Sequence, residues 1–176
     1  MTNPDVQDVN GIDVPAMREA FELVRANGSR QAPKSARVRW TGGLKLKAYV
    51  RNHGFVIDEP SQLTGEDEAP NAVEYLVGAL GACYATGFVL NATLRGIELY
   101  NLEVTVDSTQ QNVFTFLGLE TEGHSGVENL TAKLYVQADA DRQVLQEIWE
   151  HTIKTSPVGN TLIRSVSIKP ELVVVD

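Results

Sequence analysis

The sequence predicts an α+β domain in which helices pack against antiparallel sheet. The spacing of the hydrophobic residues switches repeatedly between a helical period and strict alternation. The segments follow one another as helix, strands, helix, strands, helix and strand. The chain has 176 residues, 43% hydrophobic and 22% charged, enough for one globular core. We place an N-terminal helical extension at residues 1–34 and the main domain at residues 35–176.

The first predicted element is an amphipathic helix over residues 15–27. Asp13 precedes it as a capping residue, and Pro15 suits its first turn. Asn27 and Gly28 end it. Its apolar side chains recur at helical spacing: Met17, Ala20, Phe21 and Val24.

Three strands are expected next. Residues 36–41 and 44–51 alternate between apolar and polar side chains, and Gly42-Gly43 between them predicts a two-residue hairpin turn. Residues 52–57 suggest a third strand.

The polar face of this hairpin is basic, although the protein as a whole is acidic. Its cations are Arg37, Arg39, Lys45, Lys47 and Arg51. Three interpretations stay open: an anion site, a solvated sheet face, or a partner for the acidic run Glu66-Asp-Glu68 across a subunit interface.

A long apolar helix is predicted from Asn71 to about Arg95, where Gly96 ends it. Between Tyr75 and Leu90, Thr86 is the only polar residue other than glycine. A helix that is apolar all round is buried all round, by sheet, neighbouring helices or a second subunit. Three glycines each cost about 1 kcal/mol of helix propensity. We therefore expect another backbone to approach closely at Gly78, Gly81 and Gly87.

The second half of the chain predicts four further segments. In order they are strands at 102–106 and 130–136 joined by a long connection, a helix capped by Asp139 or Asp141 and closed by Pro157, and one or two strands at 166–175. One face of the helix is apolar and consists of Val144, Leu145, Ile148, Trp149 and Ile153.

Composition and charge exclude several classes of function. A net charge of −8 argues against nucleic acid as a partner. The apolar stretch of the long helix falls short of the roughly 20 residues of a membrane span, so we expect no membrane partner. The polar, acidic start is unlike a signal peptide, and we expect a cytoplasmic protein. The three histidines have no zinc-like spacing, so neither a metal nor a cofactor is expected: His53, His124 and His151.

Cys83 is the one obvious candidate for chemistry, and it has two interpretations. It is either a nucleophile that attacks a peroxide O–O bond or a small apolar residue of a buried helix, and composition alone favours the second. Its helical neighbours carry no charge: Ala79, Leu80, Thr86 and Gly87. Any activating charge must therefore come from elsewhere in the fold.

Several segments together resemble the OsmC/Ohr family of osmotically induced and organic-hydroperoxide-resistance proteins. They are Asn71-Ala-Val-Glu-Tyr-Leu-Val-Gly-Ala-Leu-Gly-Ala-Cys-Tyr84, Arg95-Gly-Ile97, Leu102-Glu-Val104, Thr41-Gly-Gly43 and Thr155-Ser-Pro-Val158. The resemblance implies an OsmC-like fold with antiparallel sheets around a buried cysteine helix, in an intertwined homodimer. It also implies reduction of organic hydroperoxides by a peroxidatic cysteine, which matches Cys83.

The sequence departs from the family pattern at three positions. Ser156 stands where members carry the resolving cysteine, so an external thiol would have to act as reductant. Leu44 stands where they place an activating arginine, which Arg51, or Lys45 or Lys47, would have to replace. Glu74 matches the family glutamate but stands one residue closer to the cysteine.

Helix geometry limits the role of Glu74. Nine residues separate it from Cys83, so the two point to opposite sides of the helix, about 13 Å apart along its axis. Glu74 therefore acts on a partner's thiol or is an ordinary acid of the first turn.

Two functions follow as hypotheses. The first is thiol-dependent reduction of small apolar hydroperoxides by Cys83 alone. The second is a non-catalytic dimeric binding or scaffold protein that kept the fold, with another apolar ligand beside the central helix.

Overall fold

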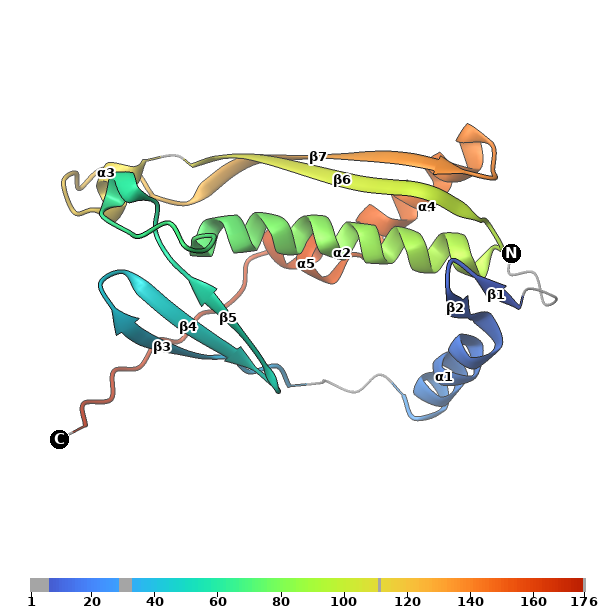
Figure 1. The fold of residues 1–176 in the computed structure, drawn as a ribbon, viewed down its shortest axis with the longest axis horizontal. Coiled ribbons are helices and arrows are strands. Elements are labelled where there is room, and N and C mark those ends of the chain that lie inside the picture. The colour runs from blue at the N-terminus through green and yellow to red at the C-terminus, as the bar shows by residue number, and fades with distance from the viewer. Residues whose placement is uncertain (1–6, 29–32, 111, 176) are drawn as a thin grey trace.

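The computed structural model describes residues 7–28, 33–110 and 112–175 and confirms the α+β class (Figure 1). The elements are β1 (Asp8–Val9), β2 (Ile12–Asp13), α1 (Val14–Ala26), β3 (Arg37–Gly42), β4 (Lys45–Val50), β5 (His53–Ile57), the 3-10 turn Ser61–Leu63, α2 (Ala72–Leu94), β6 (Leu99–Gln110), α3 (Val113–Phe116), β7 (Val127–Ala138), α4 (Arg142–Thr155) and α5 (Pro157–Leu162). All sheets are antiparallel, in the orders β1-β2, β3-β4-β5 and β6-β7.

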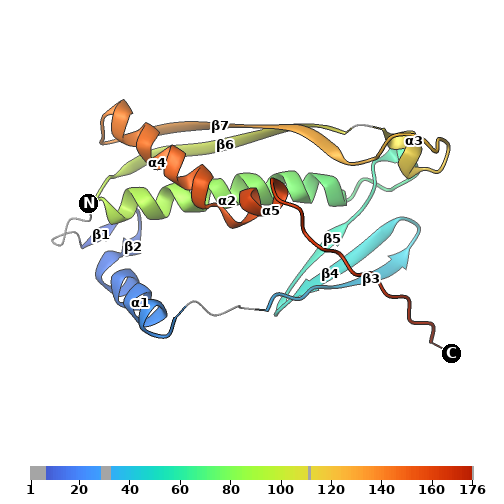
Figure 2. The ribbon, with the colours of Figure 1, turned by 180° about the vertical axis from the view of Figure 1, so that it is seen from behind.

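The hydrophobic core lies between the β6–β7 hairpin and the helices α2 and α4. The two strands run several residues beyond the predicted ranges and pair Leu102 with Val136. α2 lies along this hairpin, and α4 and α5 pack on its flank (Figure 2). The buried residues of this core are Phe88, Ala92, Ile97 and Ile148. The predicted apolar face of α4 is confirmed, since Val144, Leu145 and Trp149 pack on this cluster.

α2 begins and ends as the sequence predicts. Asn71 and Glu74 form a reciprocal capping box, and Gly96 follows the helix with a φ of 75°. Two of the three glycines are sites of close approach, but the nearest atoms belong to side chains and not to another backbone as expected. A Cβ on Gly81 would lie 3.3 Å from a Val106 methyl, and one on Gly87 would lie 2.9 Å from a Thr152 methyl.

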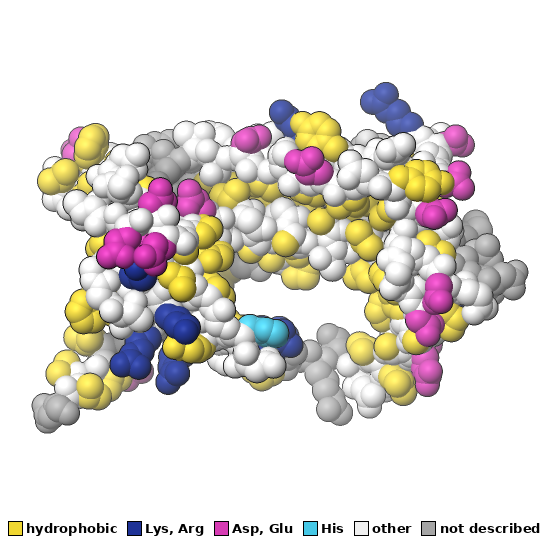
Figure 3. Space-filling view, viewed as in Figure 1, with side chains coloured by type: hydrophobic (Ala, Val, Ile, Leu, Met, Phe, Trp, Pro, Cys, Tyr) yellow, Lys and Arg dark blue, Asp and Glu magenta, His cyan; other side chains and the backbone are white. Residues whose placement is uncertain are grey.

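The expected burial of α2 on all sides is not found within one chain. Among the described residues, those of α2 that are buried are Leu80, Gly81, Phe88, Ala92 and Thr93. The opposite side is open, and a Cβ on Gly78 would meet nothing within 4 Å. Figure 3 shows hydrophobic side chains of α2 facing the open space below it. The sheet and the neighbouring helices therefore account for only one side of this helix.

The expectation that the apolar stretch falls short of a membrane span is wrong, because α2 has the length and composition of one, with a mean hydropathy of 1.5 over its most apolar window. One such helix is weak evidence for a membrane, because the core helix of a globular protein has the same composition. The contacts of α2 with β6, α4 and α5 indicate such a core helix.

The β3-β4-β5 sheet forms as predicted, but its first turn lies one residue later. Gly42 pairs with Lys45, so Gly43 and Leu44 form the turn instead of Gly42-Gly43. A register shift between Trp40 and Gly42 displaces the hairpin. Gly42, with a φ of 133°, supplies the backbone conformation that this shift requires.

The N-terminal extension consists of the β1–β2 hairpin and α1. α1 is confirmed to within one residue at each end, and Asp13 Oδ1 accepts a hydrogen bond from Ala16 N (2.8 Å). The hairpin is tied to the C-terminal end of α2 by Asn10, which adopts a φ of 56°. Its side chain donates to Thr93 Oγ1 (2.9 Å) and the Ile97 carbonyl (2.9 Å) and accepts from Leu99 N (2.8 Å). The division at residue 34 stays a prediction.

In the C-terminal region one expectation is confirmed and one is wrong. The helix α4 closes before Pro157 as predicted. Pro157 also begins α5, a helix that was not predicted, because Pro is favourable in a first helical turn. Residues 166–175 form no strand in the described chain, because they do not pair with any of its strands. Figures 1 and 2 show this segment running past the β3-β4-β5 sheet without joining it. Its apolar side chains Ile168 and Leu172 are 83% and 88% exposed.

Candidate active site

Cys83 and Ser156 are brought together, although they lie far apart in the sequence. Ser156 Oγ donates a hydrogen bond to Cys83 Sγ over 3.1 Å and accepts one from Gly159 N, also at 3.1 Å. Ser156 is 4% exposed, and Cys83 is half-buried near the middle of α2. The connection between α4 and α5 therefore contacts the middle of α2 at the cysteine.

The backbone between α4 and α5 explains where this hydroxyl lies. Ser156 is both the C-cap of α4 and the N-cap of α5, with a φ of −59° and a ψ of 122°. A residue before proline is driven out of the helical region, so Pro157 forces the chain to leave α4 at this point. The capping bond from Gly159 N then fixes the Ser156 hydroxyl beside the sulfur.

Tyr84 forms the wall next to this pair. A Cβ on Gly159 would lie 2.9 Å from the Tyr84 hydroxyl and 3.2 Å from Ser156 Oγ, so only glycine leaves room there. The Tyr84 ring meets the Trp149 ring edge-on, with centroids 5.3 Å apart. Burial raises the pKa of Tyr84, and the charge of Cys83 raises it further. The hydroxyl therefore stays protonated and able to donate a hydrogen bond.

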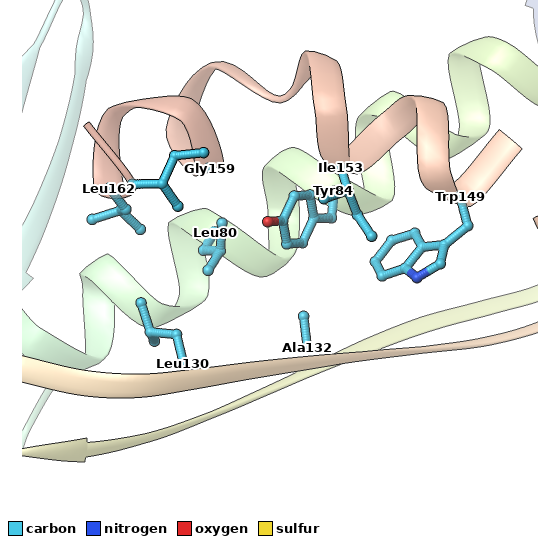
Figure 4. Close-up of a pocket in the computed structure, with 9 residues that line it drawn as sticks. Leu80, Tyr84, Leu130, Ala132, Trp149, Ile153, Gly159 and Leu162 are labelled. Carbon is cyan, nitrogen blue, oxygen red and sulfur yellow. The ribbon is translucent and has the colours of Figure 1, made fainter.

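A cavity of about 230 Å³ opens beside Tyr84, between α2, β7, α4 and α5 (Figure 4). Its lining is mostly apolar and consists of Leu80, Tyr84, Leu130, Ala132, Trp149, Ile153, Gly159, Leu162 and Ile163. Gly159 and Tyr84 border both the cavity and the Cys83–Ser156 pair. Cys83 and Ser156 are not among the lining residues, so the cavity is a neighbour of the pair and is separated from the sulfur by Tyr84 and Gly159.

Glu74 lies where helix geometry placed it, away from Cys83. It is exposed in the first turn of α2, and its carboxylate accepts the Asn71 backbone N–H at 2.8 Å. Within its own chain it therefore acts as a capping residue.

Arg51 is not brought to Cys83 either. It occupies the turn between β4 and β5 with a φ of 55°, and its side chain is exposed. This turn is at the end of the sheet opposite Lys45.

Lys45 is the basic residue of the hairpin that meets the acidic run of its own chain. It pairs with Glu66 and, at 2.7 Å, with Glu68. Hydrogen bonds from Lys45 to Glu66 and Glu68 raise its pKa above the usual 10.5. The acidic run thus meets this lysine within one chain rather than across a subunit interface.

The sequence analysis missed Tyr84, Gly159 and Thr152 as neighbours of the site. Thr152 lies one turn before Ser156, is 1% exposed, and its Oγ1 has no hydrogen-bond partner in the described chain. The signal for Gly159 was its place in the third position after a Ser-Pro cap, where a bulky side chain would reach the helix that carries Cys83.

No group of three or more histidine, cysteine, aspartate or glutamate side chains gathers in the described residues as a metal site would require.

Comparison with known proteins identifies the fold. The family described as OsmC-like protein matches residues 65–171, more than half of the chain. A crystal structure of an OsmC-like protein from Mycoplasma pneumoniae superposes with a TM-score of 0.64 at 16% identity, covering 76% of this chain and 89% of that one. The comparison with curated proteins returned no match.

Two similar structures carry a functional name. An organic hydroperoxide resistance protein OsmC from Legionella pneumophila has a TM-score of 0.54 at 14% identity, covering 76% of this chain and 91% of that one. An organic hydroperoxide resistance protein from Elizabethkingia anophelis has a TM-score of 0.53 at 19% identity, covering 76% and 89%. At such identities the likeness shows the fold alone. From the family match and these folds, the chain belongs to the OsmC-like protein family.

Proposed function

We propose that the protein reduces small apolar organic hydroperoxides through Cys83, with an external thiol as reductant. The observation that carries the proposal is the 3.1 Å hydrogen bond from Ser156 to the Cys83 sulfur. It supports the interpretation of Ser156 as the residue at the position of a resolving cysteine, because its hydroxyl lies beside the thiol. The names of the Legionella and Elizabethkingia structures support the choice of substrate.

The reaction consumes one hydroperoxide and two thiols. The Cys83 thiolate attacks the distal oxygen of ROOH, the O–O bond breaks, and the alkoxide leaves as ROH after taking a proton. The sulfur is oxidised by two electrons to a sulfenic acid. An external thiol then forms a mixed disulfide and releases water, and a second thiol frees Cys83 as the external disulfide leaves.

The apolar cavity suits the organic part of such a substrate. Its lining gives no charged contact to a ligand, and the protonated Tyr84 hydroxyl is a hydrogen-bond donor on its wall. Hydrogen peroxide would gain nothing from this apolar surface, whereas an alkyl or aryl hydroperoxide would.

We further propose a cytoplasmic homodimer. The chain exposes 13373 Å², whereas a compact 19.3 kDa monomer exposes about 8,500 Å². The excess is of the size that obligate dimers bury. The open side of α2 carries small residues, Gly78, Ala79 and Ala82, that allow another helix to approach closely. In such a dimer Glu74 or Arg51 of one copy would be free to approach Cys83 of the other.

Cumene hydroperoxide followed by intact-mass measurement tests the reaction. We expect a gain of one oxygen at Cys83, its removal by added thiol, and no gain in Cys83→Ser. Unchanged mass under a large excess, with no peroxide consumed, would refute the proposal.

The Ser156→Cys variant provides a second test of the same geometry. Because the Ser156 hydroxyl contacts the sulfur, we expect a disulfide with Cys83 under mild oxidation, seen as a loss of two hydrogens. Thr155→Cys, one residue away on an exposed position, is the matched control and should stay reduced.

A non-catalytic binding protein is the second candidate, and one observation favours it. In the described chain neither Glu74 nor Arg51 interacts with Cys83, so the family's activating pair is not assembled in one copy. This candidate predicts that cumene alcohol, which has no O–O bond, binds the cavity as tightly in Cys83→Ser as in the wild type. Rapid oxidation of Cys83 by stoichiometric hydroperoxide would exclude it.

A further inference from the structure

The Ser156 hydroxyl has two hydrogen-bond partners, and together they fix the direction of its proton. Gly159 N, at 3.1 Å, can only donate, so Ser156 Oγ accepts from it through a lone pair. The hydroxyl proton is left for another acceptor, and Cys83 Sγ lies 3.1 Å away. Ser156 is 4% exposed, so little water can compete for this proton. The backbone of α5 therefore directs a hydrogen-bond donor at the sulfur.

This donor favours the deprotonated form of the sulfur. A thiolate is a stronger acceptor than a thiol, because a hydrogen bond to an ionised group is about twice as strong as one between neutral groups. A bond that is stronger to the charged form stabilises that form. The thiolate is also the form of cysteine that acts as a nucleophile. The bond from Ser156 to Cys83 thus acts on the step that makes the sulfur reactive.

The elements packed against α2 bring uncharged residues to the turns around Cys83. These residues are Thr152, Ser156 and Gly159 of α4 and α5, Val104 and Val106 of β6, and Leu130 and Ala132 of β7. The titratable neighbour on α2 itself is Tyr84, which stays neutral because burial raises its pKa. His151 and Lys154, the titratable side chains in the last turns of α4, are exposed. In the part of the chain that the structure describes, the stabilisation of a thiolate therefore falls to the Ser156 hydroxyl.

We propose that Ser156 is a catalytic residue, whose hydroxyl, directed by Gly159 N–H, stabilises the Cys83 thiolate by a hydrogen bond. The inference rests on the function proposed above and adds to it the group that activates the thiol. A cysteine at position 156 would offer an S–H, which is a weaker donor than a hydroxyl. Serine at this position thus gives up an internal disulfide and gains a stronger donor to the sulfur. It takes over the activation that Glu74 and Arg51 do not supply within one chain.

The pH profile of Cys83 alkylation tests the proposal. Iodoacetamide reacts with the thiolate, and intact mass measured at fixed times gives the rate at each pH. Ser156→Ala removes the donor, so the midpoint of the profile should move to higher pH by about one unit. At a pH below both midpoints this variant should be alkylated about tenfold more slowly than the wild type. An unchanged midpoint would overturn the proposal.

Two further variants separate the donor from the cap of α5. Ser156→Thr keeps a hydroxyl and should keep the midpoint of the wild type. Ser156→Asp keeps an oxygen for Gly159 N but puts a carboxylate beside the sulfur, so its midpoint should lie above that of Ser156→Ala. If Ser156→Ala acted only by loosening α5, Ser156→Asp would restore the midpoint of the wild type, and that result would contradict the proposal.

Asn160→Ala is the matched control. The Asn160 side chain donates to the Lys154 carbonyl (3.0 Å) and the Ser156 carbonyl (2.8 Å), so its loss loosens the same connection and leaves the hydroxyl in place. Its midpoint should equal that of the wild type, and a shift as large as that of Ser156→Ala would refute the proposal. The reaction with hydroperoxide is tested separately. If cumene hydroperoxide leaves Cys83 unchanged while the midpoint depends on Ser156, the proposed function fails and the role of Ser156 stands.

Discussion

The two halves of this molecule differ in where their apolar side chains lie. Around the β6–β7 hairpin, Phe88 and Ile148 are fully enclosed by α2, α4 and the strands. In the β3-β4-β5 sheet and α1, Trp40 and Val24 are about two-thirds exposed, and few large apolar side chains are hidden. A single chain therefore buries the core of one half and leaves the apolar side chains of the other half exposed to solvent. The sulfur lies in the first, complete half.

The largest expected effect is in the complete half. Ile148→Ala should lower the free energy of unfolding by about 2–5 kcal/mol, because it leaves a cavity among fully enclosed side chains. Trp40→Ala at low protein concentration should change it by less than about 0.5 kcal/mol, because that ring is exposed in one chain. Denaturant titration of both variants measures the contrast. Equal losses would show that the two halves are equally enclosed.

Two glycines of α2 compare an enclosed and an exposed side of the same helix. Gly87→Ala should destabilise the protein by about 1–3 kcal/mol, because its methyl group would lie 2.9 Å from Thr152 on α4. Gly78→Ala should stabilise a single chain by about 0.5–1 kcal/mol, because it gains helix propensity and meets nothing. Thermal melts at low concentration distinguish them. A destabilising Gly78→Ala there would mean that the open side of α2 is occupied.

Asn10 joins the N-terminal extension to the complete half. Asn10→Ala removes three hydrogen bonds to Thr93, Ile97 and Leu99 and should cost about 1–3 kcal/mol. We expect faster hydrogen exchange in residues 8–26 and unchanged exchange in β6 and β7. Asn27→Ala, whose side chain bonds only to the Leu23 carbonyl of its own helix, should leave the attachment unchanged.

The smallest effect is electrostatic and concerns the loop that ends the sheet. The pKa of Lys45 is raised by its bonds to Glu66 and Glu68. The contribution of these bonds to the free energy of unfolding is therefore complete below pH 10.5 and is lost as the pH rises above that value. Burial pushes the pKa of Asp58 up, but bonds from the Glu68 and Glu59 N–H groups and the charge of Lys45 outweigh it and lower the pKa below 3.8. Its contribution is present above pH 3.8 and is lost as the pH falls further.

Stability measured against pH tests these signs. At neutral pH both Lys45→Met and Asp58→Asn should have a lower free energy of unfolding than the wild type. This difference should disappear at alkaline pH for Lys45→Met and at acidic pH for Asp58→Asn. A deficit that is the same at every pH would show that these variants act through packing instead.

The sequence predicted the elements whose partners lie close in the chain or whose pattern is strong. α1, α2 and α4 follow from caps and period, and the three-stranded sheet follows from alternation. The turn lies at Gly43-Leu44 instead of Gly42-Gly43 because the register of the two strands shifts after Trp40. The alternation of apolar and polar residues within one strand does not show how that strand is paired with its neighbour. Residues 166–175 alternate like a strand, but a strand also needs a pairing partner, and this segment pairs with none of the strands in the described chain.

The candidate site was predictable in part for a similar reason. Cys83 and Ser156 followed from the family resemblance, and the hydrogen bond between them was not visible in composition or spacing. Tyr84 and Gly159 escaped because their roles arise from contact between α2 and α5, helices that are distant in sequence.

The exposed C-terminal segment has a consequence for how the protein survives in a cell. Leu172-Val-Val-Val175 has high β-propensity, no charge and no proline, and each of its side chains is at least 70% exposed. In a newly made chain that has not yet met a partner, this apolar segment would be available to pair with a free strand edge of the same chain or of another protein. If copies meet slowly, aggregation and degradation of the single chains are favoured. Because faster synthesis raises the concentration of single chains, the amount of folded protein depends on the rate of synthesis as well as on stability.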